Sequence, residues 1–135
     1  MKRVFLALTA AVALCGCAGA SGQACAPGLM RMVLADLFFG RDVMGRAMVS
    51  DDEWQVFLDE EVTPRFPTGL SAADLSGQYR NNSGRIVRER TKELLIFTPE
   101  GSDSEAKLNA IRDAYKRRFD QESVLLVKTP LCAGF

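Results

Sequence analysis

Four segments of the chain carry apolar patterns that are typical of β-strands. In the first segment Val33, Ala35, Leu37 and Phe39 alternate with their neighbours and therefore share one face, because successive side chains of a strand point to opposite sides. Turn-forming residues at 81–84 join the second segment to the third and predict an antiparallel return. The four predicted strands are residues 31–39, 70–79, 85–97 and 123–127, and the last is expected to stop before Pro130.

Two further segments repeat apolar residues at helical spacing, and each follows a serine with a glutamate three residues later. The pairs Ser50/Glu53 and Ser102/Glu105 predict capping boxes, in which the serine hydroxyl accepts a backbone N–H and the glutamate reaches back. Pro64 is expected to end the first helix, because the residue before a proline avoids the α region. The apolar stripes are Trp54, Phe57, Leu58 and Val62 in the first helix and Leu108, Ile111, Tyr115 and Phe119 in the second.

The order of these elements predicts an α+β fold of the ferredoxin-like, split-βαβ kind. In this βαββαβ arrangement, a four-stranded antiparallel sheet carries both helices on one of its faces. The chain has 135 residues, of which 47% are hydrophobic, and this suits one folded domain. We expect that single domain to cover residues 28–135.

Two of the predicted strands are apolar on both faces. These stretches are Leu94-Leu95-Ile96-Phe97 and Val124-Leu125-Leu126-Val127, whereas a sheet with one covered face should alternate apolar with polar residues. We therefore expect something to cover the second face: a second copy of the chain in a homodimer, a ligand, or the chain's own N-terminal tether. The alternative is a sheet centre that is apolar on both sides without a partner.

The N-terminal segment has the features of an export signal. Lys2 and Arg3 precede an apolar run at residues 4–14. That run is too short to span a membrane, which needs about 20 apolar residues. The sequence Leu14-Cys15-Gly16-Cys17 resembles the lipobox of bacterial lipoproteins. The resemblance implies that residues 1–16 are a signal peptide and that Cys17 becomes the lipid-modified first residue of the mature protein.

A lipid on Cys17 would anchor the domain to a membrane. Each buried methylene contributes about 0.8 kcal/mol, so two or more acyl chains such as palmitate hold a protein stably. Residues 17–27 are small and polar and suit a flexible tether. An aspartate directly after the modified cysteine would resemble an inner-membrane retention signal, but this chain has Ala18 there. The expected location is therefore the cell envelope, on the periplasmic side of the outer membrane. The alternative is a plain signal peptide cut near Ala18 or Ala20.

The remaining cysteines predict one disulfide. Cys15 leaves with the signal and Cys17 carries the lipid, so Cys25 and Cys132 remain at the two ends of the mature domain. An exported chain with two remaining cysteines favours a bond between them. Two free buried thiols are the alternative.

Five stretches of the chain form an ordered set of motifs, at residues 53–58, 62–70, 77–80, 114–119 and 121–125. These stretches resemble the bacterial domain of unknown function 3574 family. The resemblance runs from about Leu34 to Phe135, with its motifs in order. Tyr79, where the family more often has tryptophan, and Ser71 to Asp74, where it is more β-branched, depart from the pattern. The resemblance implies a fold and a compartment and no particular reaction.

Composition excludes many classes of activity. The chain has no histidine, which rules out Ser-His-Asp and Cys-His catalysis and imidazole ligands. With 17 basic and 17 acidic side chains, the charge gives no reason to expect nucleic-acid binding. No spacing of carboxylates or cysteines resembles a metal site, and no glycine-rich phosphate loop follows a strand. We therefore expect no metal and no cofactor.

Polar residues around the predicted hairpin are the candidate ligand-binding residues. Arg88, Arg90 and Lys92 share a strand face and Glu89 points the opposite way. A row of guanidinium groups suits the recognition of carboxylates or phosphates. The alternative is a solvated strand face whose charges discourage edge pairing. The candidate set is Gln78, Tyr79, Arg80, Arg88, Glu89, Arg90 and Tyr115.

The leading functional hypothesis is a non-catalytic, lipid-anchored envelope domain that binds a small anionic ligand or a protein partner. One alternative is an enzyme that works without histidine or cofactor in a polar pocket over the sheet. The other is a structural envelope protein that associates with itself. Converging polar groups in a concave pocket would favour a ligand or a substrate. A charged face opposite an apolar one would favour the structural role.

Overall fold

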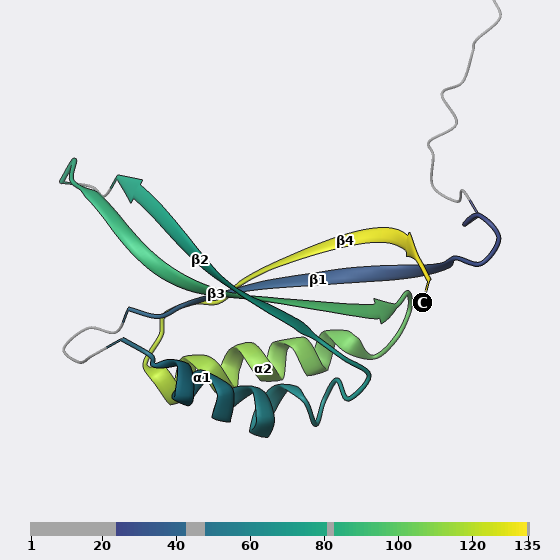
Figure 1. Ribbon diagram of the computed structural model, residues 1–135, viewed down its shortest axis with the longest axis horizontal. Helices are drawn as coiled ribbons and strands as arrows, with labels where there is room; N and C mark the ends of the chain where they lie inside the picture. The colour runs from purple at the N-terminus through teal and green to yellow at the C-terminus, as the bar shows by residue number, and fades with distance from the viewer. Residues whose placement is uncertain (1–23, 43–47, 81–82, 135) are drawn as a thin grey trace, which may run out of the picture.

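The computed structural model describes residues 24–42, 48–80 and 83–134 (Figure 1). The predicted signal peptide, Cys17 and most of the tether lie outside these described residues. No helix within them is long and apolar enough to cross a membrane. The elements in order are β1 (Met30–Gly40), α1 (Asp51–Phe57), the π-helical turn η1 (Leu58–Val62), β2 (Ser71–Arg80), β3 (Ile86–Pro99), α2 (Ser104–Phe119) and β4 (Leu125–Ala133).

The four strands form one antiparallel sheet in the order β2-β3-β1-β4. β1 lies opposite β3 from Met32↔Pro99 to Gly40↔Thr91. Its other edge pairs with β4, from Met30↔Ala133 to Phe38↔Leu125. Each βαβ unit thus receives a strand of the other unit between its own two strands. This topology, with both helices on one side of the sheet (Figure 1), confirms the predicted ferredoxin-like α+β fold.

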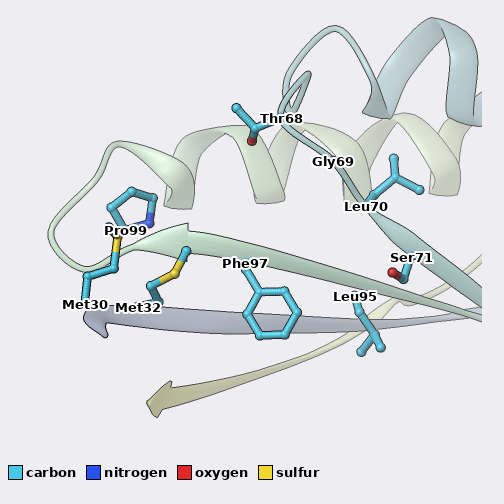
Figure 2. A pocket seen from close by; sticks show the side chains of 9 residues that line it. All are labelled: Met30, Met32, Thr68, Gly69, Leu70, Ser71, Leu95, Phe97 and Pro99. Atoms are coloured by element: carbon cyan, nitrogen blue, oxygen red, sulfur yellow. The ribbon is translucent and has the colours of Figure 1, made fainter. Parts of the chain in front are cut away.

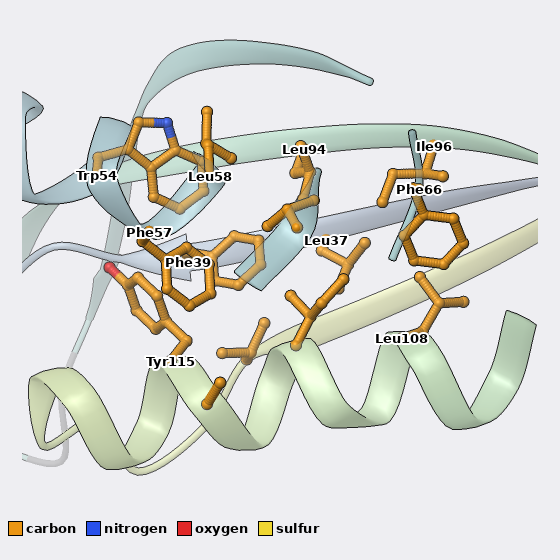
Figure 3. Close-up of a cluster of buried hydrophobic side chains, with 14 of the residues drawn as sticks. Leu37, Phe39, Trp54, Phe57, Leu58, Phe66, Leu94, Ile96, Leu108 and Tyr115 are labelled. Carbon is orange, nitrogen blue, oxygen red and sulfur yellow. The ribbon is translucent and has the colours of Figure 1, made fainter. Parts of the chain in front are cut away.

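The hydrophobic core lies between the sheet and the helices. Ala35, Leu37 and Phe39 point into it from β1, as their alternation predicts. Figure 3 shows the aromatic residues at the centre of the core. The ring centroid of Tyr115 lies 4.7 Å from that of Phe39 and 5.1 Å from that of Phe57. Burial of each such side chain contributes about 1.5–3 kcal/mol, so this cluster fixes the helices on the sheet.

One of the two predicted capping boxes forms. The Ser50 hydroxyl accepts from the Glu53 backbone N–H at 3.2 Å, and the Ser50 N–H donates to Glu53 Oε2 at 2.8 Å. The predicted box of Ser102 and Glu105 is wrong, because α2 begins at Ser104 with Asp103 as an N-cap that makes no side-chain bond. At Ser102 the chain is still in the turn after β3, where its N–H bonds to the Pro99 carbonyl.

Two proline predictions differ in outcome. The helical segment that follows Ser50 ends before Pro64 as expected, although its last turn is the π-helical η1. Pro130, in contrast, does not stop the last strand, because β4 continues to Ala133. β4 pairs with β1 on one side and is an edge strand. Such a strand tolerates a proline whose missing N–H would face outward.

The predicted disulfide joins the two ends of the domain. Cys25 and Cys132 are bonded, with their Cα atoms 5.7 Å apart. Cys132 lies on β4 opposite Arg31 of β1. The bond therefore fastens the segment that precedes β1 to the edge of the sheet, and the end of the predicted tether, from Cys25 onward, is held against the domain.

Candidate functional site

The face of the sheet opposite the helices, here called the open face, is largely apolar. Strand alternation places Leu34 and Phe38 of β1 there, with Leu95 and Phe97 of β3. Leu125 and Val127 of β4 extend the same surface. The side chains of Phe97, Leu125 and Val127 are 40%, 59% and 42% exposed. Contiguous exposed apolar surface of this kind marks interaction sites in soluble proteins.

A groove of about 600 Å³ extends the open face at one end of the sheet (Figure 2). β2 begins at Ser71 opposite Leu95, so the last residues of β3 have no β2 neighbour. The loop that leads into β2 passes beside them and closes one side. Side chains of Met32, Leu95 and Phe97 line the groove with those of Leu70 and Pro99, so its wall continues the apolar surface.

Two carboxylates interrupt this apolar face. Asp36 lies opposite Leu95 on β3 and Val127 on β4, and Glu93 lies opposite Phe38. Asp36 Oδ1 is buried and has no hydrogen-bond partner in the described part of the chain. Burial, with a smaller contribution from the charge of Glu93, raises the pKa of Asp36 above its ordinary value. The face therefore holds an acceptor that lacks a donor.

The β2–β3 hairpin extends beyond the rest of the sheet (Figure 1). The register of β1 on β3 ends at Thr91, so residues 86–90 of β3 pair with β2 alone among the described strands. All residues of β2 are exposed. We call residues 76–80 of β2 and 86–90 of β3 the β-arm.

The β-arm carries most of the candidate ligand-binding residues, divided between its two sides. Gln78 lies opposite Arg88 and Arg80 opposite Ile86, on the side that faces the helices. Tyr79 and Glu89 lie on the side of the open face. A hollow of about 530 Å³ brings together Gln78, Arg88, Glu89 and Arg90, while Arg80 bonds to the Gly84 carbonyl at the tip. Asp42 lines this hollow as well. Its carboxylate and that of Glu89 stand beside the two arginines, so the charge of the hollow is mixed.

Tyr115 does not belong with the other candidates. Its ring is fully buried in the core, and its hydroxyl donates to the Gly40 carbonyl at 2.9 Å. Its position in the apolar stripe of α2 turns it toward the sheet (Figure 3). The prediction of Tyr115 as a ligand-binding residue is therefore corrected: it supports the core.

Sequence reasoning missed a buried cluster of charges beneath the β-arm. Lys92, which shares a strand face with Arg88 and Arg90, is 6% exposed, and Arg41 is 5% exposed. Lys92 Nζ lies 2.8 Å from Asp51 Oδ1 and 2.7 Å from Asp74 Oδ1. Arg41 contacts the same oxygens at 3.1 and 3.4 Å. The four residues come from β2, β3, the start of α1 and the segment after β1, so a local sequence pattern does not reveal the cluster.

The pKa values of this cluster follow from its pairing. Burial lowers the pKa of Lys92, but its hydrogen bonds to Asp51 and Asp74 outweigh that effect and leave the pKa raised. The hydrogen bond from Lys92, with the charge of Arg41, lowers the pKa of Asp51. Pairing thus favours the charged forms of Lys92 and Asp51, and the cluster fastens β2 and the start of α1 to β3.

Comparisons with known proteins identify a family and a fold. The family described as Protein of unknown function (DUF3574) matches residues 34–135. No curated protein matches the chain in sequence. A phage SAM lyase in complex with S-methyl-5'-thioadenosine has a similar structure, with a TM-score of 0.53 and 20% identity over 84% of this chain and 95% of that chain. CutA from Synechococcus elongatus has a TM-score of 0.50 and 15% identity over 77% of this chain and 80% of its own. At these identities the likeness shows the fold alone.

Proposed function

The chain belongs to the DUF3574 family of proteins of unknown function, and from that premise we propose that it is an exported, lipid-anchored envelope protein whose domain binds a protein partner. The partner binds through the open face, and the domain is a non-catalytic interaction module. The apolar open face is the observation that carries this proposal, because three large side chains there remain more than a third exposed.

Export and anchoring are supported by the sequence and by the disulfide. The lipobox-like residues up to Cys17 supply the anchor, and the bond between Cys25 and Cys132 suits an oxidising compartment. The tether from Cys17 to Cys25 spans at most about 28 Å when fully extended. The domain is therefore held close to the membrane surface, where its open face meets envelope proteins.

The charges on the open face favour a protein over the membrane as its partner. Asp36 and Glu93 would enter the bilayer if the apolar face lay in it, and carboxylates are costly there. Loss of Lys2 and Arg3 from 17 basic and 17 acidic side chains leaves a net charge of −2 on the mature chain. An anionic bilayer surface repels such a chain weakly.

A lipid-labelling experiment tests the anchor. Cells that express the chain are grown with labelled palmitate, and the protein is examined for label. We expect label on the wild type and on Cys15→Ser, and none on Cys17→Ser, because Cys15 leaves with the signal. Unlabelled wild-type protein would reject the anchor.

Site-specific photo-crosslinking in intact cells tests the open face. A photoreactive residue is placed at Leu125 or Val127 of the open face and, as the matched control, at Arg117 on the exposed side of α2. We expect covalent protein products from the two open-face positions and not from the control. If neither open-face position gives a product, the face does not dock a protein.

A small anionic ligand in the hollow of the β-arm is the second candidate. The gathering of Gln78, Arg88 and Arg90 favours it. We would expect phosphate or succinate to raise the melting temperature of the wild type and not that of Arg88→Ala. An equal shift in both proteins, or none in either, would remove this candidate.

A further inference from the structure

We propose that the partner of the open face is a second copy of this chain, whose β-arm lies across the face and pairs Arg88 with Asp36 and Glu93. This inference rests on the proposed function, because it names the partner of the same surface. Three observations support it: the open face has no cation among its described residues, the β-arm carries exposed arginines, and the tether does not fit the face.

The described residues of the open face include no cation. Asp36 Oδ1 is buried there without a hydrogen-bond partner in the described part of the chain, and the charge of Glu93 acts on the same carboxylate. The described residues of β1, β3 and β4 that point to this side include no lysine and no arginine. A buried acceptor without a donor destabilises the protein, and a partner's guanidinium near this carboxylate would offset that cost. The face therefore fits an apolar surface that carries an arginine.

The β-arm is a surface of that kind. On its helix-facing side Arg80 and Arg88 flank Ile86, which is 51% exposed. Arg88 makes no ion pair with any carboxylate among the residues that the structure describes. A guanidinium presents several N–H donors in one plane, so one arginine of a partner can bond to the Asp36 carboxylate and approach Glu93. The two surfaces are thus complementary in charge and in apolar content.

The β-arm also has strand edges that pair with no other described strand. Within the described sheet β2 pairs with β3 alone, and residues 86–89 of β3 have no neighbour on the side of β1. The first backbone contact on that side is the bond from the Arg41 N–H to the Arg90 carbonyl. A two-stranded ribbon is marginally stable alone, and free strand edges favour pairing with another chain. Contact with a second copy would order the β-arm.

The tether does not fit the open face. Residues 18–24, between the expected lipid and the disulfide, contain no basic and no large apolar side chain. They could neither pair with Asp36 nor cover Phe97 and Leu125. A second copy supplies both features, and two copies can exchange β-arms, so that each gives one arm and receives the other in a closed, symmetric assembly.

The experiment uses two full-length copies of the chain that carry different C-terminal tags and are expressed together. A photoreactive residue at Val127 reports contact, and a product that carries both tags identifies self-association. We expect this product to fall about tenfold in Arg88→Glu and in Asp36→Lys, because each variant places like charges together. The exchanged pair Arg88→Glu with Asp36→Lys should restore it. Arg117→Glu, an exposed charge reversal on α2, should leave it unchanged.

Milder variants guard against misfolding. Arg88→Ala and Asp36→Asn remove the pairing without a reversed charge, and should lower the two-tag product while the Cys25–Cys132 bond still forms. A product that joins Val127 to a different protein would overturn this inference and leave the proposed function standing. The inference would also be overturned if the yield of the two-tag product were the same in Arg88→Glu and Arg88→Ala as in the wild type. Absence of any product at Val127 and Leu125 would overturn the proposed function as well.

Discussion

Among single residues, Asp36 has the surroundings that suit its charge least. Its neighbours across the sheet are Leu95 and Val127, and Glu93 adds a like charge from the diagonal position. A carboxyl whose pKa is raised by folding binds more protons in the folded state than in the unfolded state. The free energy of unfolding of the monomer therefore falls as pH rises from the ordinary pKa of 3.8 through the raised value.

Asp36→Asn should stabilise the monomer at neutral pH and not in acid. At pH 7 the variant removes a disfavoured charge, and we expect the free energy of unfolding to rise by on the order of 1 kcal/mol. Near pH 3 the wild-type carboxyl is protonated in both states, so the gain should vanish. Urea unfolding of dilute protein at the two pH values measures this, with Glu122→Gln as an exposed control. An equal gain at both pH values would contradict the assigned cause.

At the scale of elements, the charge cluster decides how β2 is held. Its two cations, Arg41 and Lys92, are buried, whereas the carboxylates of Asp51 and Asp74 are 75% and 68% exposed. Removal of a cation therefore leaves carboxylates that water can solvate. Removal of both negative charges instead leaves two buried cations without counter-charges, and breaking a buried pair in this way costs about 3–5 kcal/mol.

The two kinds of substitution should consequently differ. We expect Asp51→Asn with Asp74→Asn to lower the free energy of unfolding by about 3–5 kcal/mol, and Lys92→Met to lower it by less than about half of that. Urea unfolding at pH 7 measures both. Equal losses would show that the cations are solvated in the folded protein.

The elements themselves were predictable where local signals agree, as in β1, where alternation fixes the core face, and at Ser50, where both halves of the capping box form. The signals failed where long-range structure decides. Pro130 does not end β4 because that strand lies at an edge, and the turn after β3 places Ser102 too early to cap α2.

The residue types of the candidate site could be predicted from the sequence, but their arrangement in space could not. Apolar runs at residues 94–97 and 124–127 indicated the open face. The β-arm depends on where β1 stops against β3, which is a matter of register between distant segments. The same holds for Lys92, whose pattern matches the exposed Arg88 and Arg90 but whose partners are brought from Asp51 and Asp74 by the fold.

For the whole molecule, the disulfide combines two roles, because Cys25 lies in the tether and its bond to Cys132 also holds the edge of the sheet. It closes a loop with a sequence separation of 107 residues. The chain-entropy account gives at most about 4–5 kcal/mol for a loop of that length. Because β4 is exposed along most of its length, this covalent bond helps to keep the end of the strand in place.

Replacing both cysteines should therefore destabilise the domain without changing its fold. We expect Cys25→Ser with Cys132→Ser to lower the free energy of unfolding by about 2–5 kcal/mol, because the unfolded chain regains the entropy of an open loop. Urea unfolding measures the loss, and reduced wild-type protein is the control that should match the variant. If the variant were as stable as the oxidised wild type, the bond would serve to hold the tether alone, and β4 would be kept in the sheet by its pairing with β1.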